Sequence, residues 1–315
     1  MDFPRDDSGV SSGGGRPDAE TLVDRFEEHR AHLRAVGYRM LGSLSEADDA
    51  VQEAWLRLNR TGAAGVDNLG GWLTTVTARV CLDILRSRTS RREEPLDTHV
   101  PDPVVSGAAG SDPEQQALLA DSVGLALLVV LDTLGPAERL AFVLHDMFHV
   151  PFDDIAPVVG RTPAAARQLA SRARRRVRGA DAAPDPDLRR QRVVVDAFLA
   201  ASRGGDFDAL VAVLDPDVVL RADAGAGLPG VSKEIRGARA VAESALMYSA
   251  AAAYGRPVLI NGAAGIVTAP GGNPVALMAF TVRDGLIKQI HILADPDRLA
   301  GMRFPEFPEF PEREG

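Results

Sequence analysis

Apolar residues recur at helical spacing near the start of the chain. From Leu22 to Met40 they return at intervals that place them on one face of a helix, and Gly42 ends the run. The preceding residues, 1–21, are rich in glycine, serine and acids and show no such period. We therefore expect a disordered tail followed by a helix.

Two further helices are expected after the first. Ser45 is placed as the N-cap of the second helix, because the carboxylates that follow it suit the positive end of the helix dipole. Residues 59–70 are rich in glycine and predict a loop, and a helical period resumes near Trp72. The three helices predict a compact bundle over residues 22–92.

The middle of the chain holds a linker and a second helical block. Residues 93–113 contain four prolines with several glycines and serines, which predicts an extended linker. Helical periods resume over residues 114–180. There Gly160 stops a short helix and Thr162 caps a last, basic helix. A helix, a glycine turn and a basic helix are typical of a helix-turn-helix.

The pattern changes again after a Pro- and Asp-rich linker over residues 181–188. Residues 189–303 start with helical periods and continue with strand-like runs, which indicates an α+β domain, and residues 304–315 form a tail. Arg-Asp-Gly at 283–285 separates two apolar runs and predicts a hairpin. Helices are expected at 189–203, 207–214 and 238–250, and strands at 217–222, 256–260, 275–283 and 286–293. The predicted fold class is multidomain, with two all-α modules and a C-terminal α+β domain.

Composition favours a soluble cytoplasmic protein. The 315 residues are 45% hydrophobic and 25% charged, and no apolar run reaches the roughly 20 residues that a membrane helix needs. The first residues show no signal-peptide pattern. The single cysteine, Cys81, cannot form an internal disulfide, so a reducing compartment fits.

The distribution of charge is more informative than the net charge of −9. Residues 167–178 contain six arginines and no acid. A smaller arginine cluster lies over residues 86–92. Acidic proteins can carry local basic faces that bind phosphate, so nucleic acid remains a candidate partner.

The basic last helix is the strongest candidate site for DNA. In a helix-turn-helix the N-terminal side chains of the second helix reach base edges and its later cations reach phosphates. The expected base readers are Arg167, Gln168, Ser171 and Arg172. Arg175 and Arg178 are expected to contact phosphates, and Thr162, at the start of the helix, is a further candidate DNA contact. The alternative is a solvated basic face.

Two other polar faces are candidates in the first bundle. One is acidic and consists of Asp48, Asp49, Gln52 and Glu53, although a solvated face explains it equally well from spacing alone. The other lies on the third helix and consists of Trp72, Thr75, Arg79 and Arg86. Mixed aromatic and basic faces suit melted DNA, where bases stack and phosphates meet arginine, but Trp72 by itself is also a plausible core residue.

The sequence predicts no metal site and no cofactor. His145 and His149 have the i, i+4 spacing of metal ligands, but no third ligand is evident. Glycine patterns of phosphate-binding loops or dinucleotide folds are absent, as is the nucleophile motif of the α/β-hydrolases.

Two segments resemble a known family. The run LGSLSEADDAVQEAWLRL (41–58), followed by GGWLTTVTARVCLDILRSRTSRR (70–92), resembles region two of an extracytoplasmic-function (ECF) sigma factor. The run LGPAERLAFVLHDMFHVPFDDIAPVVGRTPAAARQLASRARRRV (134–177) resembles region four. The C-terminal block resembles a SnoaL-like domain, a cone-shaped α+β fold. The combination resembles the SigJ-like subgroup, in which such a domain is fused to the sigma regions.

The resemblance implies partners and roles. The acidic face would bind the clamp helices of the polymerase β′ subunit, and the β flap would be a second contact. The loop at 59–70 and the third helix would capture and melt the minus-ten element, and the basic helix would read the minus-thirty-five element. Three short motifs of the subgroup appear with substitutions, at 101–103, 223–227 and 295–299. They imply the regulatory residues Asp223, Gly225, Gly227, Asp295, Asp297 and Arg298.

We therefore expect a sigma factor that binds core RNA polymerase and promoter DNA, catalyses nothing itself and contacts no membrane. The C-terminal domain would modulate its activity in cis. One alternative is a one-component helix-turn-helix regulator whose C-terminal domain binds a small molecule. Another is an enzyme, with that domain a cyclase or isomerase.

Overall fold

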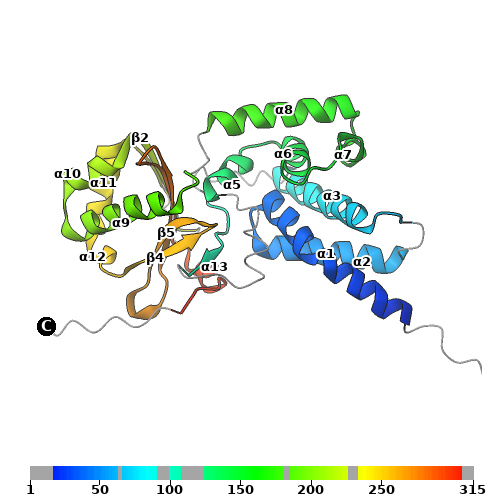
Figure 1. Cartoon of the computed structure of the whole chain (residues 1–315), viewed down its shortest axis with the longest axis horizontal. Helices are drawn as coiled ribbons and strands as arrows, with labels where there is room; N and C mark the ends of the chain where they lie inside the picture. Colours follow the sequence, from blue (N-terminus) through cyan, green and yellow to red (C-terminus); the bar gives the residue numbers. More distant parts are fainter. Residues whose placement is uncertain are drawn as a thin grey trace, which may run out of the picture.

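The computed structural model describes residues 17–62, 66–90, 99–107, 124–180, 185–225 and 233–306, and of residues 17–21 only the backbone. Two helical modules lie beside a mixed helix and sheet domain, with α5 (Leu125–Asp132) and α13 (Pro296–Ala300) at the junction (Figure 1). This arrangement confirms the predicted fold class.

The first module is a bundle of α1 (Pro17–Leu41), α2 (Leu44–Thr61) and α3 (Leu69–Ser90). The expected tail over 1–21 is wrong for residues 17–21, which are helical. Proline is well tolerated in a first helical turn, so Pro17 can start α1. The N-cap of α2 is Ser43 and not Ser45. The loop is also shorter than residues 59–70, because α2 extends to Thr61.

The second module contains α5 (Leu125–Asp132), α6 (Pro136–Phe142), the π-helical turn η1 (Val143–Met147), α7 (Phe152–Val159) and α8 (Pro163–Gly179). Gly160 ends α7 with φ 69°, a left-handed conformation that glycine adopts without a Cβ penalty. The Thr162 hydroxyl accepts a hydrogen bond from the Ala165 N–H, at 3.3 Å, and so caps α8. The predicted helix-turn-helix is confirmed.

The C-terminal domain packs helices against one face of a sheet. The helices are α9 (Leu188–Gly204), α10 (Phe207–Val213), α11 (Ala238–Met247) and α12 (Ser249–Ala252), and a short α13 (Pro296–Ala300) follows the last strand. The strands are β1 (Val105–Ser106), β2 (Leu214–Asp223), β3 (Lys233–Arg236), β4 (Gly255–Ile260), β5 (Ala263–Thr268), β6 (Ala276–Arg283) and β7 (Leu286–Leu293). Their order in the sheet is β1-β4-β5-β6-β7-β2-β3, with only the β2–β7 pair parallel among the described strands.

Two tight hairpins connect neighbouring strands of this sheet. The predicted hairpin between β6 and β7 is present, and both central residues, Asp284 and Gly285, have positive φ. Asn261 and Gly262 make the same kind of turn between β4 and β5. Turns with positive φ at both positions match the twist of paired strands, which explains the Asp-Gly and Asn-Gly sequences.

The expected linker over 93–113 is not a free tether where the structure describes it. Residues 99–107 run between the modules, and β1 pairs with the edge strand β4, with Val105 opposite Ile260. The linker therefore adds a strand to the C-terminal sheet. Sequence periodicity could not reveal this, because two residues are too few to show alternation.

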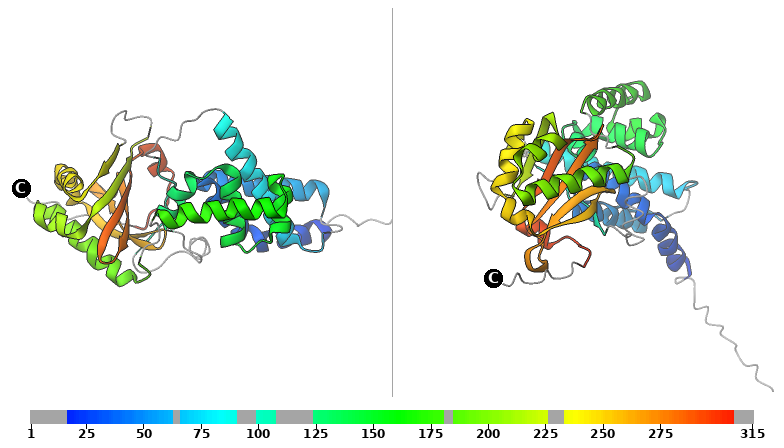
Figure 2. Two further views of the ribbon diagram at one scale, coloured as in Figure 1. Left: turned by 90° about the horizontal axis from the view of Figure 1, so that it is seen from above. Right: turned by 60° about the vertical axis from the view of Figure 1, so that its left-hand side comes forward.

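One hydrophobic core joins the modules. It contains Leu82 of α3, Leu128 of α5, Ile155 of α7 and Leu277 of β6, together with linker valines such as Val104. The two further views show helices α9 to α12 on the face of the sheet that points away from the two helical modules (Figure 2). Phe304, from the expected tail, packs against the same core. Among the described helices, none is long and apolar enough to cross a membrane.

Candidate functional site

The outer face of α8 is polar and open to solvent. Ala166, Ala170 and Ala173 are buried against the rest of the module. At 100° per residue, Gln168, Ser171 and Arg175 project from the opposite side of the helix, and all three are exposed. The geometry permits α8 to enter a groove with these side chains leading.

The flanking arginines of α8 contact the protein itself. The guanidinium of Arg172 pairs with Glu138 of α6 at 3.0 Å. Arg167 lies over the ring of Phe152, with 5.2 Å from Cζ to the ring centroid. Arg175 and Arg178 make no ion pair with the described residues and stay exposed. Of the expected base readers, Gln168 and Ser171 are therefore open to solvent, whereas Arg167 and Arg172 contact other side chains of the module.

The acidic face of α2 is also divided. Arg34 forks onto Asp48, with N–O distances of 2.7 and 3.1 Å. Glu53 pairs with Arg57 at 2.8 Å. Asp49 and Gln52 are exposed, and neither pairs with another described side chain.

The predicted face of α3 is exposed at Arg79 and Arg86, whereas Trp72 and Thr75 are partly buried. The Thr75 hydroxyl donates to the Gly71 carbonyl at 3.0 Å. Trp72 packs against the core cluster of the first bundle, which also contains Leu73 and Phe26. One edge of Trp72 therefore supports the core while the helix presents arginines to solvent.

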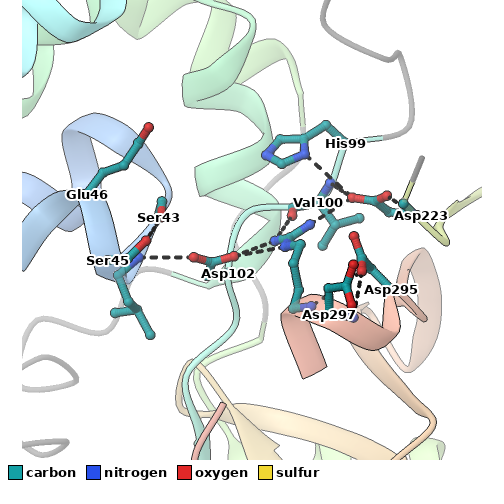
Figure 3. A network of polar contacts seen from close by, with 12 residues as sticks. Ser43, Ser45, Glu46, His99, Val100, Asp102, Asp223, Asp295 and Asp297 are labelled. Atoms are coloured by element: carbon teal, nitrogen blue, oxygen red, sulfur yellow. Dashed lines mark hydrogen bonds and ion pairs between the residues drawn. The ribbon is translucent and has the colours of Figure 1, made fainter. Parts of the chain in front are cut away.

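Arg298 of α13 joins segments that lie far apart in the sequence, and its partners Val100, Asp102 and Asp223 are labelled in Figure 3. Its Nη1 donates to Asp223 at the end of β2, at 2.9 Å. Its Nε donates to Asp102 of the linker at 3.0 Å, and Nη2 donates to the Val100 carbonyl at 2.6 Å. We call Asp102, Asp223 and Arg298 the arginine hub.

The hub reaches the first helical module through Asp102. The second carboxylate oxygen of Asp102 accepts a hydrogen bond from the N–H of Leu44, the first residue of α2, at 3.1 Å. The Asp102 N–H donates to the Gly42 carbonyl at 2.8 Å. Ser43 makes no side-chain cap, so the linker carboxylate supplies the cap that the local sequence lacks.

Asp223 is an ionised, buried carboxylate with only 3% of its surface exposed. Desolvation alone would raise its pKa. Hydrogen bonds from His99 and from the N–H groups of Val100 and Gly225, together with the charge of Arg298, outweigh that effect and lower the pKa to about 2. Because the pKa is depressed, the stabilisation from Asp223 is complete above its ordinary pKa and is lost as the pH falls toward 2.

Gly225 fits its place beside Asp295 for a steric reason. Asp295 caps α13 by accepting from the N–H groups of Asp297 and Arg298. A Cβ on Gly225 would overlap the Asp295 carboxylate, and Gly225 also has φ of +71°. The side chain of Asp297 is exposed and stands apart from the hub. Gly227 lies outside the described residues.

A second contact between region two and the C-terminal domain escaped the sequence analysis. The Tyr38 hydroxyl of α1 donates to the Asp102 carbonyl at 2.5 Å, and the amide of Asn261 donates to that hydroxyl at 3.0 Å. The Asn261 carbonyl oxygen accepts from the Val104 N–H at 3.0 Å. Burial raises the pKa of Tyr38, so the phenol stays neutral. Only the Asn-Gly turn signal marked this position in the sequence.

The two histidines with metal-like spacing have other roles. Nδ1 of His145 lies 3.0 Å from the Val150 carbonyl, and its ring stacks on Phe152 at 3.9 Å. His149 has φ of 56° and lies after the π-helical turn. Across the described part of the chain, no three potential metal-ligating side chains come together.

We predict that Gly225→Ala destabilises the protein more than Gly285→Ala does. Both positions have positive φ, so alanine carries a left-handed strain of about 1–2 kcal/mol at each. Only at 225 does the new Cβ also meet a carboxylate, because the space around Gly285 is empty. Thermal unfolding of the two variants measures the difference. Equal losses would contradict the close packing of Gly225 against Asp295.

Comparison with known proteins identifies the modules. Residues 25–91 match the Sigma-70 region 2 family and residues 124–177 match Sigma-70, region 4. The chain is 40% identical over 300 residues to the ECF RNA polymerase sigma factor SigJ of Mycobacterium tuberculosis, covering 90% of this chain and 95% of SigJ. It is 38% identical over 284 residues to the probable ECF sigma factor SigI of the same species, covering 88% and 94% of the two chains.

A solved structure agrees with these sequence matches. The crystal structure of Mycobacterium tuberculosis SigJ superposes with a TM-score of 0.74 at 37% identity, over 89% of this chain and 99% of that chain. The superposed region includes helical modules and C-terminal domain alike. The chain therefore belongs to the ECF RNA polymerase sigma factors, which bind core RNA polymerase and direct transcription initiation at specific promoters.

Proposed function

We propose that each of the described faces has its own role in this sigma factor. The acidic face of α2 binds polymerase, α3 holds melted promoter DNA and α8 reads duplex DNA, while the C-terminal domain holds the two sigma modules together in cis. The observation that carries the cis role is the arginine hub, because Arg298 ties the C-terminal domain to the linker residue Asp102, which in turn caps α2. Region four joins the same junction through the shared hydrophobic core.

The polymerase contact is proposed at Asp49 and Gln52 first. Their side chains are exposed and unpaired among the described residues, so binding costs them no internal partner. Asp48 and Glu53 would have to exchange Arg34 and Arg57 for cations of the partner. By the family resemblance, that partner is the clamp-helix region of β′, with the β flap as the second contact.

We expect Asp49→Lys to weaken binding to core polymerase at least about tenfold, because it reverses a charge at the centre of the acidic face. Asp24→Lys is the matched control, since Asp24 is an exposed carboxylate on α1 outside that face. Affinity for fluorescently labelled core enzyme measures the effect. If both variants bind like the parent, the acidic face is not the polymerase contact.

The two DNA contacts differ in chemistry. The α3 face combines Trp72 with Arg79 and Arg86, which suits unpaired bases and their phosphates. The outer face of α8 suits an intact duplex, because a major groove admits a helix. Arg172 and Arg167 would leave Glu138 and Phe152 to reach base edges, whereas Arg175 and Arg178 are already free for phosphates.

Alanine substitutions should separate readers from phosphate contacts. Arg167→Ala with Arg172→Ala should change sequence preference, by about 1–3 kcal/mol per lost base contact. Arg175→Ala with Arg178→Ala should weaken all sequences alike and lower the salt slope by about one unit per phosphate lost. Binding titrations on cognate and scrambled duplexes at several salt concentrations measure both. Identical behaviour of the two pairs would rule out this docking of α8.

We call the packing of both sigma modules on the C-terminal domain the docked arrangement. In it, regions two and four are in direct contact. Arg139 of α6 donates to the Arg39 carbonyl of α1 at 3.3 Å, and the rings of His32 and Phe148 lie 5.2 Å apart. Promoter elements two helical turns apart are separated by roughly 70 Å of duplex. We infer that the sigma modules separate to engage both elements, so the hub favours a state that is not engaged with the promoter.

Weakening the hub should therefore raise promoter-dependent transcription at limiting sigma concentration. Arg298→Gln leaves Asp223 buried without its cation, which should destabilise the docked arrangement by roughly 3 kcal/mol. Tyr38→Phe removes the hydrogen bonds of the hydroxyl to Asn261 and to the Asp102 carbonyl but leaves the ion pairs of Arg298 in place, so it should raise transcription by a smaller amount. Asp297→Ala is the control, since its side chain is exposed. Run-off transcription with core polymerase measures the effect, and unchanged activity in both variants would remove the cis role.

The remaining expectations follow from this role. We propose that the protein works in the cytoplasm with RNA polymerase and catalyses no reaction, its C-terminal domain serving regulation. Two sigma modules fit this role better than a one-component regulator, which would need only the helix-turn-helix. Failure to bind core polymerase would favour that alternative.

A further inference from the structure

A cleft of about 1720 Å³ separates the sigma modules from the C-terminal domain. Arg175 and Arg176, near the end of α8, line one side, and Arg221 of β2 and Arg236 of β3 line the other. Asp102 of the hub lies at its border, so the cleft is formed only while the modules are docked.

The cleft is positive although the chain carries a net charge of −9. Seven arginines line it, against four carboxylates. Three of those carboxylates are each taken by an arginine: Glu46 by Arg88, Asp102 by Arg298 and Asp132 by Arg139. The excess charge therefore concentrates where α8 meets the edge of the sheet.

That corner has too few carboxylates for its arginines. Glu234 is shared between Arg221 at 2.8 Å and Arg236 at 2.7 Å. Arg175 has no ion pair among the described residues, and Arg176 reaches Glu138 only at 3.5 Å. An anion with several charged oxygens would meet guanidinium groups from both walls.

A buried arginine adds a second, independent sign of a ligand. Arg139 lines the cleft and is only 2% exposed, yet its Nη2 has no hydrogen-bond partner. Desolvation lowers the pKa of Arg139, as expected for a buried cation with incomplete compensation. One oxygen of Asp132 also lacks a donor. Both atoms are buried in the cleft wall, so a small rotation of these side chains toward the cleft would offer a donor and an acceptor to a ligand that carries both kinds of group.

We propose that the cleft binds a small phosphorylated ligand of the nucleotide type, with its phosphates between α8 and the β2–β3 edge and its hydrogen-bond donors toward Asp132. Such a ligand would stabilise the docked state, because its contacts come from both sides of the cleft. It would also compete with promoter DNA for Arg175. The regulatory consequence rests on the proposed cis role, whereas the binding site requires only the docked arrangement of the modules in the structure.

The test uses adenosine triphosphate and inorganic pyrophosphate as probes on the full-length protein by isothermal titration calorimetry. Arg221→Gln with Arg236→Gln removes one wall of the site. Arg189→Gln with Arg190→Gln removes the same charge from the exposed start of α9 and serves as the control. Glu234→Gln frees both wall arginines, so it tests the site by gain of affinity even if the double variant folds poorly.

We expect saturable binding that weakens at least about tenfold in the wall variant, changes less than about twofold in the control and tightens in Glu234→Gln. Absence of saturable binding at millimolar probe, or equal weakening in both double variants, would overturn the proposal. A wall variant that loses affinity only for duplex DNA would overturn it as well and make the edge a DNA contact.

Core polymerase affinity, measured on the same preparations without nucleotide, separates this inference from the proposed function. If the parent binds polymerase but no probe, the anion site is rejected and the sigma role stands. If the probes bind but Asp49→Lys leaves polymerase affinity unchanged, the polymerase contact is rejected and the anion site stands.

Discussion

The docked structure depends on one constraint, which is the charge of a carboxylate buried at the end of a strand. Asp223 has lost nearly all contact with water, so its charge must be met from within the protein. Arg298 supplies the cation, and the same guanidinium holds Asp102. Because the other oxygen of Asp102 caps α2, the electrostatic demand of the C-terminal domain fixes where region two begins its second helix.

The sequence predicts the parts of this molecule better than their assembly. Helical periods and turn residues located the bundle, the helix-turn-helix and the hairpin at Asp284–Gly285, because those signals act over a few residues. The arginine hub joins positions 102, 223 and 298, and no local pattern links them. Only the family resemblance pointed to Asp223 and Arg298, and it did so without revealing that Arg298 pairs with both Asp223 and Asp102.

The linker shows most clearly why local sequence patterns could not predict how the modules assemble. Its prolines correctly indicate extended backbone, but extended backbone serves equally as a tether or as an edge strand. The choice is made by the tertiary structure: Asn261 bonds Val104 through both its backbone N–H and its side chain, and β4 offers an unpaired edge. Ser45 failed as an N-cap for a related reason, because the donor at the start of α2 is satisfied by a carboxylate 58 residues away.

Opening such a structure is a cooperative event. The shared hydrophobic core, the Tyr38–Asn261 contact and the hub all cross the same junction, so separating region two exposes apolar surface and breaks polar contacts together. In the proposed mechanism, polymerase binding supplies the free energy of opening, and the first contact has to use surfaces that are already exposed in the docked state. Asp49 and Gln52 meet that condition, because they lie on the face of α2 away from the junction core. If Asp49 and Gln52 are the polymerase contact proposed above, the docked sigma factor can meet polymerase before it opens, and docking does not block the first encounter.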